Sequence, residues 1–152
     1  MYSKAEASFL TQKFWTSFGT YMSPVPSASL EKVNWINYKT GIKGIIFKLN
    51  ADKTSATVTV EIFLKDTMLQ HQYFHTFTNF AEAFTNIAGK DWLFNNDSYL
   101  ENKGEVSTII VELKNVNIFM EKDWPTIISF LKHYMIGLDA FWAVYKPAFE
   151  LI

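Results

Sequence analysis

Two histidines in the middle of this chain have the type and spacing of metal ligands. His71 and His75 lie four residues apart, so on a helix both rings would point to one face, as in metalloproteases that read H-E-x-x-H. Gln72 occupies the position of the general-base glutamate, and Glu82 is the next carboxylate, nearly two turns further on. We therefore interpret both histidines as surface or partly buried helix residues and retain them only as candidate ligands.

Glu61 lies in the segment with the clearest strand pattern and is the main candidate for a catalytic carboxylate. Restriction-endonuclease-like enzymes carry Asp on one strand and Glu-x-Lys on the next, so that carboxylates hold Mg²⁺ and the lysine positions water. Here Phe63 stands where the lysine should be, Lys65 comes only beyond the expected strand end, and Asp52 falls in a turn. A degenerate metal-dependent phosphodiesterase with Glu61 and Lys65 as catalytic candidates remains an alternative hypothesis.

Other catalytic signatures are missing from the sequence. It contains no G-x-S-x-G nucleophile turn and no G-x-x-x-x-G-K-[ST] phosphate loop. The absence of cysteine excludes disulfides, thiolate catalysis and zinc sites built on sulfur. The Gly41-Ile42-Lys43-Gly44 segment fits a turn better than a phosphate cradle, because no helix start follows it. We expect no cofactor and favour a protein that is not an enzyme.

The composition favours protein contacts over nucleic-acid contacts. All 14 basic residues are lysines, scattered along a chain with 15 acidic residues, so no cluster is available to neutralise a row of phosphates. Aromatic residues make up 17% of the chain, and so many large rings are hard to bury in one small domain. This excess favours self-association or a protein partner. The polar first residues do not resemble a signal peptide, and no segment has the composition of a membrane span, so we expect a cytoplasmic protein.

The spacing of apolar residues predicts the elements that position these groups. Helices are predicted from the capping box of Ser3 and Glu6 to the prolines after residue 23, from Asp66 to Gly89, and from residues 123–125 to Pro147, which should end or kink the last helix. Strands are predicted at residues 35–37, 45–49, 56–64, 92–95 and 106–113.

This order of elements predicts the fold class. It reads α-β-β-β-α-β-β-α, and the alternation over residues 56–64 is typical of a sheet with one buried face. We expect one α+β domain over residues 1–152, with a mainly antiparallel sheet of about five strands packed by three helices. The first helix, three strands, second helix and next strand also follow the order of the restriction-endonuclease-like core, which motivates the phosphodiesterase hypothesis.

Several segments resemble a known family. They are Trp35-Ile36-Asn37-Tyr38-Lys39-Thr40-Gly41, Gly44 with residues 45–49, Asn117-Ile118-Phe119, and Asp123-Trp124-Pro125. Through them nearly the whole chain resembles small stand-alone members of a bacterial domain-of-unknown-function family, number 4268. The resemblance implies an α+β fold and no established activity. Longer relatives join a similar domain to nuclease-like or restriction-associated segments, and Ser107-Thr108-Ile109 stands where they commonly carry Ser-Arg-Ile.

A cluster of aromatic and polar residues is the best candidate for a binding surface. Its members are Trp35, Asn37, Tyr38, Lys39 and Lys43. The leading hypothesis is a non-enzymatic protein-interaction or accessory module, with a homodimer as one form. A small-molecule sensor with an aromatic-lined cavity between sheet and helices is a further alternative to the phosphodiesterase. The alternative to a binding surface is that Trp35 and Tyr38 complete the hydrophobic core.

Overall fold

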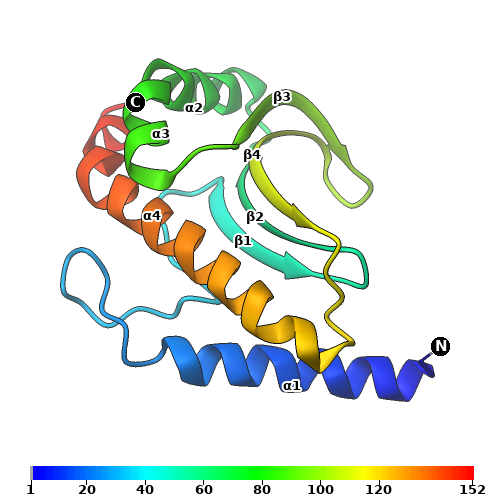
Figure 1. The fold of residues 1–152 in the computed structure, drawn as a ribbon. Helices are drawn as coiled ribbons and strands as arrows, with labels where there is room; N and C mark the ends of the chain where they lie inside the picture. Colours follow the sequence, from blue (N-terminus) through cyan, green and yellow to red (C-terminus); the bar gives the residue numbers. More distant parts are fainter. Residues whose placement is uncertain (1) are drawn as a thin grey trace.

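The structure, a computed structural model that describes residues 2–152, contains four helices and one four-stranded antiparallel sheet (Figure 1). This confirms the α+β class and gives one strand fewer and one helix more than the sequence predicted. The elements are α1 (Lys4–Met22), β1 (Ile45–Ala51), β2 (Ser55–Ile62), α2 (Thr67–Asn79), α3 (Ala81–Ala88), β3 (Leu93–Leu100), β4 (Gly104–Lys114), the 3-10 turn η1 (Glu121–Asp123) and α4 (Trp124–Glu150).

The strands lie in the order β1-β2-β4-β3, so β1 and β3 form the two edges of the sheet. The hairpin between β1 and β2 turns at Asp52, whose carboxylate accepts hydrogen bonds from the amides of Thr54 and Ser55. Such side-chain bonds to the backbone favour a turn at this position. On β2 every second residue faces the core, as the alternating pattern predicted. These fully buried residues are Ala56, Val58, Val60 and Ile62.

Helix α4 crosses the buried face of the sheet, with α1 along its first half and α2 and α3 at its other end (Figure 1). Apolar residues along this helix form the centre of the core. Those that are fully buried are Ile127, Leu131, Met135, Leu138 and Phe141. Aromatic rings fill the space between α4, α2 and α3, where Phe77 lies 4.6 Å from Phe149 and 6.0 Å from Phe141 between ring centroids.

The segment at residues 35–37 is a loop, so the strand predicted there is wrong. The Asn34 side chain accepts hydrogen bonds from the amides of Ile36 and Asn37, at 3.1 and 3.0 Å. Asparagine competes with strand pairing in this way, because its side chain replaces a neighbouring strand as the acceptor. As a result only two strands precede α2, so the element order that motivated the nuclease comparison is not present.

The long helix predicted from Asp66 to Gly89 is two helices that meet at Phe80. The expected cap is present, since the Asp66 carboxylate accepts from the amide of Leu69 at 3.1 Å. Near the end of α2 the hydroxyls of Thr76 and Thr78 donate to carbonyls four residues earlier, a contact that bends helices. The β-branched residues there also weaken the helix, which explains the break.

Helix α4 continues to Glu150 and therefore passes Pro147, which does not end it. Pro147 lacks the amide that would bond to the carbonyl of Ala143, so the helix loses one hydrogen bond close to its end. Within residues 2–152, one helical stretch, Glu121–Glu150, has the length and apolar composition of a membrane span. This is weak evidence for a span, because the same helix supplies the centre of the core.

Candidate binding grooves

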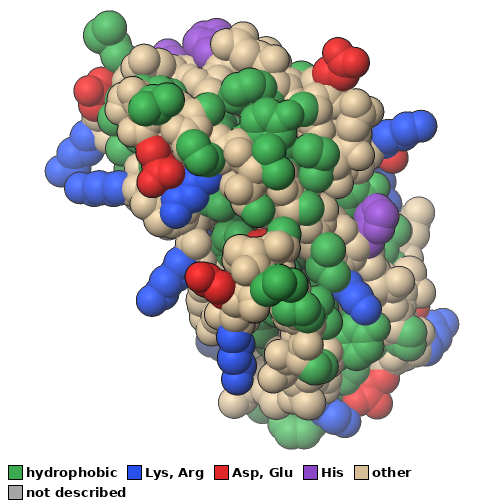
Figure 2. Space-filling model, turned by 90° about the vertical axis from the view of Figure 1, so that its left-hand side faces the viewer, with side chains coloured by type: hydrophobic (Ala, Val, Ile, Leu, Met, Phe, Trp, Pro, Cys, Tyr) green, Lys and Arg blue, Asp and Glu red, His purple; other side chains and the backbone are tan. Residues whose placement is uncertain are grey.

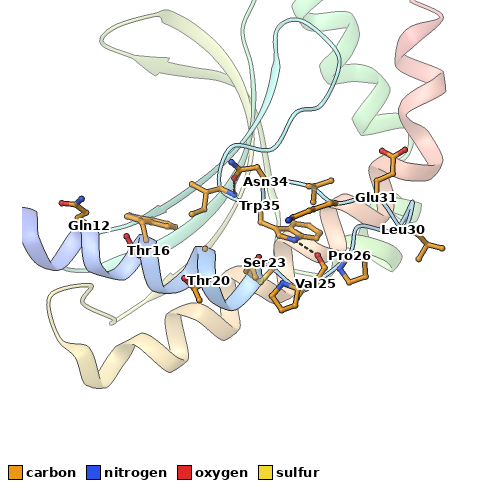
Figure 3. Close-up of a pocket in the computed structure, with 17 residues that line it drawn as sticks. Gln12, Thr16, Thr20, Ser23, Val25, Pro26, Leu30, Glu31, Asn34 and Trp35 are labelled. Atoms are coloured by element: carbon orange, nitrogen blue, oxygen red, sulfur yellow. Dashed lines mark hydrogen bonds between the residues drawn. The ribbon is translucent and has the colours of Figure 1, made fainter.

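A surface groove lies between the C-terminal half of α1 and the loop that follows it (Figure 3). Its volume is about 1300 Å³. Figure 3 shows Gln12, Thr16 and Thr20 on the helical side and Pro26 and Leu30 on the loop side. The lining thus combines apolar walls with hydroxyl and amide groups, a mixture found in ligand-binding grooves. Apolar members of the lining are Trp15, Met22, Pro24, Val25, Val33 and Ile36.

A second groove of about 530 Å³ adjoins the first and runs along β1. Trp15 and Ile36 line both grooves, so they form the boundary between them. The stretch from Ile46 to Asn50 of the edge strand lines the second groove, together with Asn37 and Tyr38. The two grooves together make an extended surface from the loop at residues 23–36 to the edge of the sheet.

A buried carboxylate on α4 holds loop segments from both grooves. Asp139, 3% exposed, accepts a hydrogen bond from the Tyr38 hydroxyl at 2.5 Å and from the amide of Ala28 at 2.7 Å. Hydrogen bonds to an ionised acceptor are stronger than neutral ones. Burial, together with the hydrogen bond to Asp139 and its negative charge, raises the pKa of Tyr38 above its usual value near 10. Asp139 therefore fixes the loop to the core helix at two points.

The loop presents an exposed apolar side chain beside the larger groove. Leu30 is 84% exposed and has a backbone φ of 65°, in the left-handed region that leucine seldom adopts. The amide of Leu30 donates to the Ser27 carbonyl at 2.9 Å, and the amide of Ser27 donates to the Glu31 carbonyl at 3.1 Å. Figure 2 views the side on which this loop projects and shows hydrophobic side chains there interspersed with lysines. An exposed leucine in a strained, hydrogen-bonded turn is typical of a binding surface.

The structure brings together three of the five residues predicted to form a binding surface. Trp35 lines the larger groove, although it is only 4% exposed and its ring nitrogen donates to the Val25 carbonyl at 3.0 Å. Asn37 and Tyr38 line the smaller groove. Lys39 and Lys43 are exposed on the loop before β1 and line neither groove. Trp35 and Tyr38 thus complete the core and also border the grooves.

Glu61, the catalytic candidate, is buried in a lysine pair on the sheet face opposite α4. Its carboxylate is 2.5 Å from the Nζ of Lys103 and 3.4 Å from the Nζ of Lys48, and its side chain is 4% exposed. Lys65 is exposed beyond the end of β2. The Asp52 carboxylate accepts hydrogen bonds within the hairpin turn, and the bond from the Thr54 amide lowers the pKa of this carboxyl group. Each oxygen of the Glu61 carboxylate therefore has a lysine ammonium group beside it.

The two candidate metal ligands lie on α2, His71 partly buried and His75 exposed. Within residues 2–152, no group of three or more His, Cys, Asp or Glu side chains is arranged to hold a metal ion. A helical histidine pair without a third ligand fits neither a structural nor a catalytic zinc site.

Sequence reasoning missed the residues that shape the grooves, above all Asp139, Trp15 and Leu30. Asp139 carried a usable signal, because it is the one acidic residue between the first and last turns of a mostly apolar helix. A carboxylate in a core stripe is rarely buried without a partner. Leu30 and Trp15 carried no such signal. The geometry of the loop decides the exposure of Leu30, and the packing around α1 decides that of Trp15.

The chain thus forms an α+β domain with two adjoining surface grooves. The chain belongs to the family described as Domain of unknown function (DUF4268), which it matches over residues 10–146. No curated protein and no solved structure matches the chain. The family match runs from α1 into the last part of α4, so it includes the sheet, both grooves and Asp139.

Proposed function

We propose that this protein is a non-enzymatic interaction module that binds a polypeptide segment in the two adjoining grooves. The observation that carries the proposal is their continuity through Trp15 and Ile36, with the walls anchored to α4 by Asp139. Pre-formed walls favour binding, because less conformational entropy is lost when a ligand docks. The partner is another protein or a second copy of this chain, and the setting we propose is the bacterial cytoplasm.

The shape of the surface favours a polypeptide over a small molecule. Sites for drug-sized ligands enclose roughly 300–1,000 Å³ and bury most of the ligand. The larger groove here has about 1300 Å³ and continues into a second groove, which suits an elongated ligand. The interior between sheet and helices is occupied by packed rings such as Phe77, Phe84 and Phe141, which supports a surface site over an internal cavity.

The arrangement of ionisable groups supports a binding role rather than catalysis. Glu61 is paired with two lysines, and Asp139 is bound by Tyr38 and the Ala28 amide. A general base or metal ligand needs a free lone pair directed at a substrate or ion. Both carboxylates that are buried within residues 2–152 use their lone pairs to hold neighbouring groups.

Selection from a displayed library of random dodecapeptides tests the proposal. We expect the immobilised protein to enrich related sequences, and the selected peptides to lose at least about tenfold in affinity for Leu30→Ser. Leu30 lines the larger groove and is 84% exposed, so its replacement affects binding more than folding. Phe9→Ser is the matched control, because Phe9 is 64% exposed and lies outside both grooves.

Two results would overturn the proposal. One is a selection that enriches nothing over the starting library. The other is a set of peptides that bind Leu30→Ser as tightly as the unmodified protein, or that respond equally to Phe9→Ser, since neither pattern locates binding at the grooves.

A further inference from the structure

The smaller groove follows the unpaired edge of the sheet at β1. The hydrogen bonds at the two ends of the β1–β2 pair define which backbone groups of β1 face this edge. The amide of Phe63 donates to the Gly44 carbonyl, and the amide of Asp52 donates to the Ser55 carbonyl, both at 2.9 Å. In an antiparallel pair, hydrogen-bonded positions alternate with positions whose backbone groups point away from the partner strand. Even-numbered residues of β1 therefore bond to β2, and odd-numbered residues direct their backbone groups outward.

Phe47 and Leu49 are the odd-numbered residues in the groove wall. Each directs one N–H and one C=O away from β2, and within residues 2–152 no hydrogen bond to these outward groups is found. Tyr38 and Asn37 also line the groove, and the ring of Tyr38 lies 5.2 Å from that of Phe47. An open strand edge facing a groove is the geometry that accepts an added strand.

The other sheet edge is protected in the ways that natural proteins use. Between Asn95 and Ser98 the pairing of β3 with β4 shifts register, and the exposed Asp97 lies within this irregularity. Bulges and charges at an edge strand discourage further pairing. β1 pairs with β2 in an unbroken register over all seven residues, so its edge is the regular one.

The charge of the surrounding segment indicates the chemistry of the added strand. Residues 32–51 contain Lys32, Lys39, Lys43 and Lys48 and no acidic residue, in a chain whose net charge is −1. Lys48 lies in the groove wall, where its Nζ is also 3.4 Å from Glu61, and Lys32 lines the neighbouring groove next to Glu31. Complementary charge steers a partner to its site and fixes its register.

From these observations we propose that β1 binds an extended acidic segment of another protein as a fifth strand of the sheet. The inference rests on the proposed function and specifies how the partner is held. Backbone bonds from Phe47 and Leu49 supply affinity, and the lysines select acidic side chains. The larger groove then receives residues of the same segment beyond the strand.

The test compares two substitutions at one position, Leu49→Pro and Leu49→Ala. Both remove the leucine side chain, but only proline removes the outward N–H, and proline is tolerated on an edge where that N–H faces solvent. Peptides selected from the dodecapeptide library are titrated by fluorescence anisotropy. We expect Leu49→Pro to weaken binding at least about tenfold relative to Leu49→Ala. We also expect the selected sequences to be enriched in Asp and Glu.

Amide hydrogen exchange provides a second measurement that needs no variant. On addition of a selected peptide, the amides of Phe47 and Leu49 should exchange at least about tenfold more slowly, because they become hydrogen-bonded. If Leu49→Pro does not fold, this comparison still decides the proposal. Unchanged exchange at both amides in a peptide-bound protein would overturn strand addition.

The remaining outcomes separate this inference from the proposed function. Peptides that need Leu30 but bind Leu49→Pro and Leu49→Ala equally would overturn strand addition and leave the interaction module standing. A selection that shows no preference for Asp and Glu, or a (dT)₂₀ oligonucleotide that displaces the peptides, would contradict the claim that the partner is an acidic polypeptide. Sedimentation equilibrium that gives a dimer dissociated by Leu49→Pro would assign the edge to a second copy. A selection that enriches nothing overturns both proposals.

Discussion

Replacing Asp139 with alanine should release the loop that forms the groove walls. The carboxylate accepts from the Tyr38 hydroxyl at 2.5 Å and from the Ala28 amide at 2.7 Å, and it is 3% exposed. Its removal leaves two donors without an acceptor, at about 1–3 kcal/mol each. Because the loop is at the surface, water reaches part of the site, so we expect a total loss of about 2–4 kcal/mol.

Asparagine at the same position separates the loss of charge from the loss of hydrogen bonds. The amide of Asp139→Asn retains one acceptor for Ala28, and its NH₂ group can donate to the Tyr38 oxygen. Only the charge assistance of the two bonds is lost, so we expect about 1 kcal/mol of destabilisation. Glu150→Gln is the control, since it removes an exposed carboxylate from the end of the same helix and should change stability by less than about 0.5 kcal/mol.

Urea unfolding followed by tryptophan fluorescence measures these differences, and the chain has five tryptophans. The expected order of stability is unmodified, then Asp139→Asn, then Asp139→Ala. Amide exchange at Ala28 should also accelerate in Asp139→Ala before global unfolding occurs. A stability of Asp139→Ala equal to that of Glu150→Gln would refute the role assigned to this carboxylate.

Three further predictions concern stability. Because the pKa of Tyr38 is raised in the folded state, the contribution of its hydroxyl to the free energy of unfolding is complete below pH 10 and is lost as pH rises further. Urea titrations should show that the free energy of unfolding falls by at most about 1.4 kcal/mol per pH unit, less because Tyr38 is partly exposed, and Tyr38→Phe should lack this fall. Lys103→Met should cost about 1–3 kcal/mol in urea unfolding, because it leaves the buried Glu61 carboxylate with only part of its charge compensated. Lys13→Met, which removes an exposed ion pair, should cost under about 1 kcal/mol, and equal losses would contradict the buried pair. Gly44→Ala should lower the thermal midpoint by several degrees, since φ is 94° there and a Cβ would overlap a leucine side chain; an unchanged midpoint would contradict the close approach.

Periodicity predicted the sheet and the outer helices because local rules and burial agree there. The alternating residues of β2 face the core, and the capping box of Ser3 and Glu6 begins α1 as expected. Local side-chain bonds decided the elements that were predicted wrongly. Asn34 converts the expected strand at residues 35–37 into a turn, and this contact depends on a rotamer that periodicity does not report.

The groove surface was predicted only in part, because it depends on contacts distant in sequence. Trp35 and Tyr38 were identified from their chemistry, but the groove needs Trp15 from α1 and the anchor of Asp139, 101 residues after Tyr38. Such pairs have no local pattern. Glu61 was a candidate because it is a carboxylate on a strand, and its two lysine partners could not be predicted because they come from β1 and from the turn between β3 and β4.

A chemical-shift map of the ¹⁵N-labelled protein, titrated with a peptide selected from the dodecapeptide library, tests the central claim most directly. The account predicts that the largest amide shifts lie along the two grooves, at Trp15, Leu30, Ile36, Phe47 and Leu49. Shifts concentrated instead around Glu61 and Lys103, or around His71 on α2, would contradict it, because they would place the ligand on a different face of the molecule.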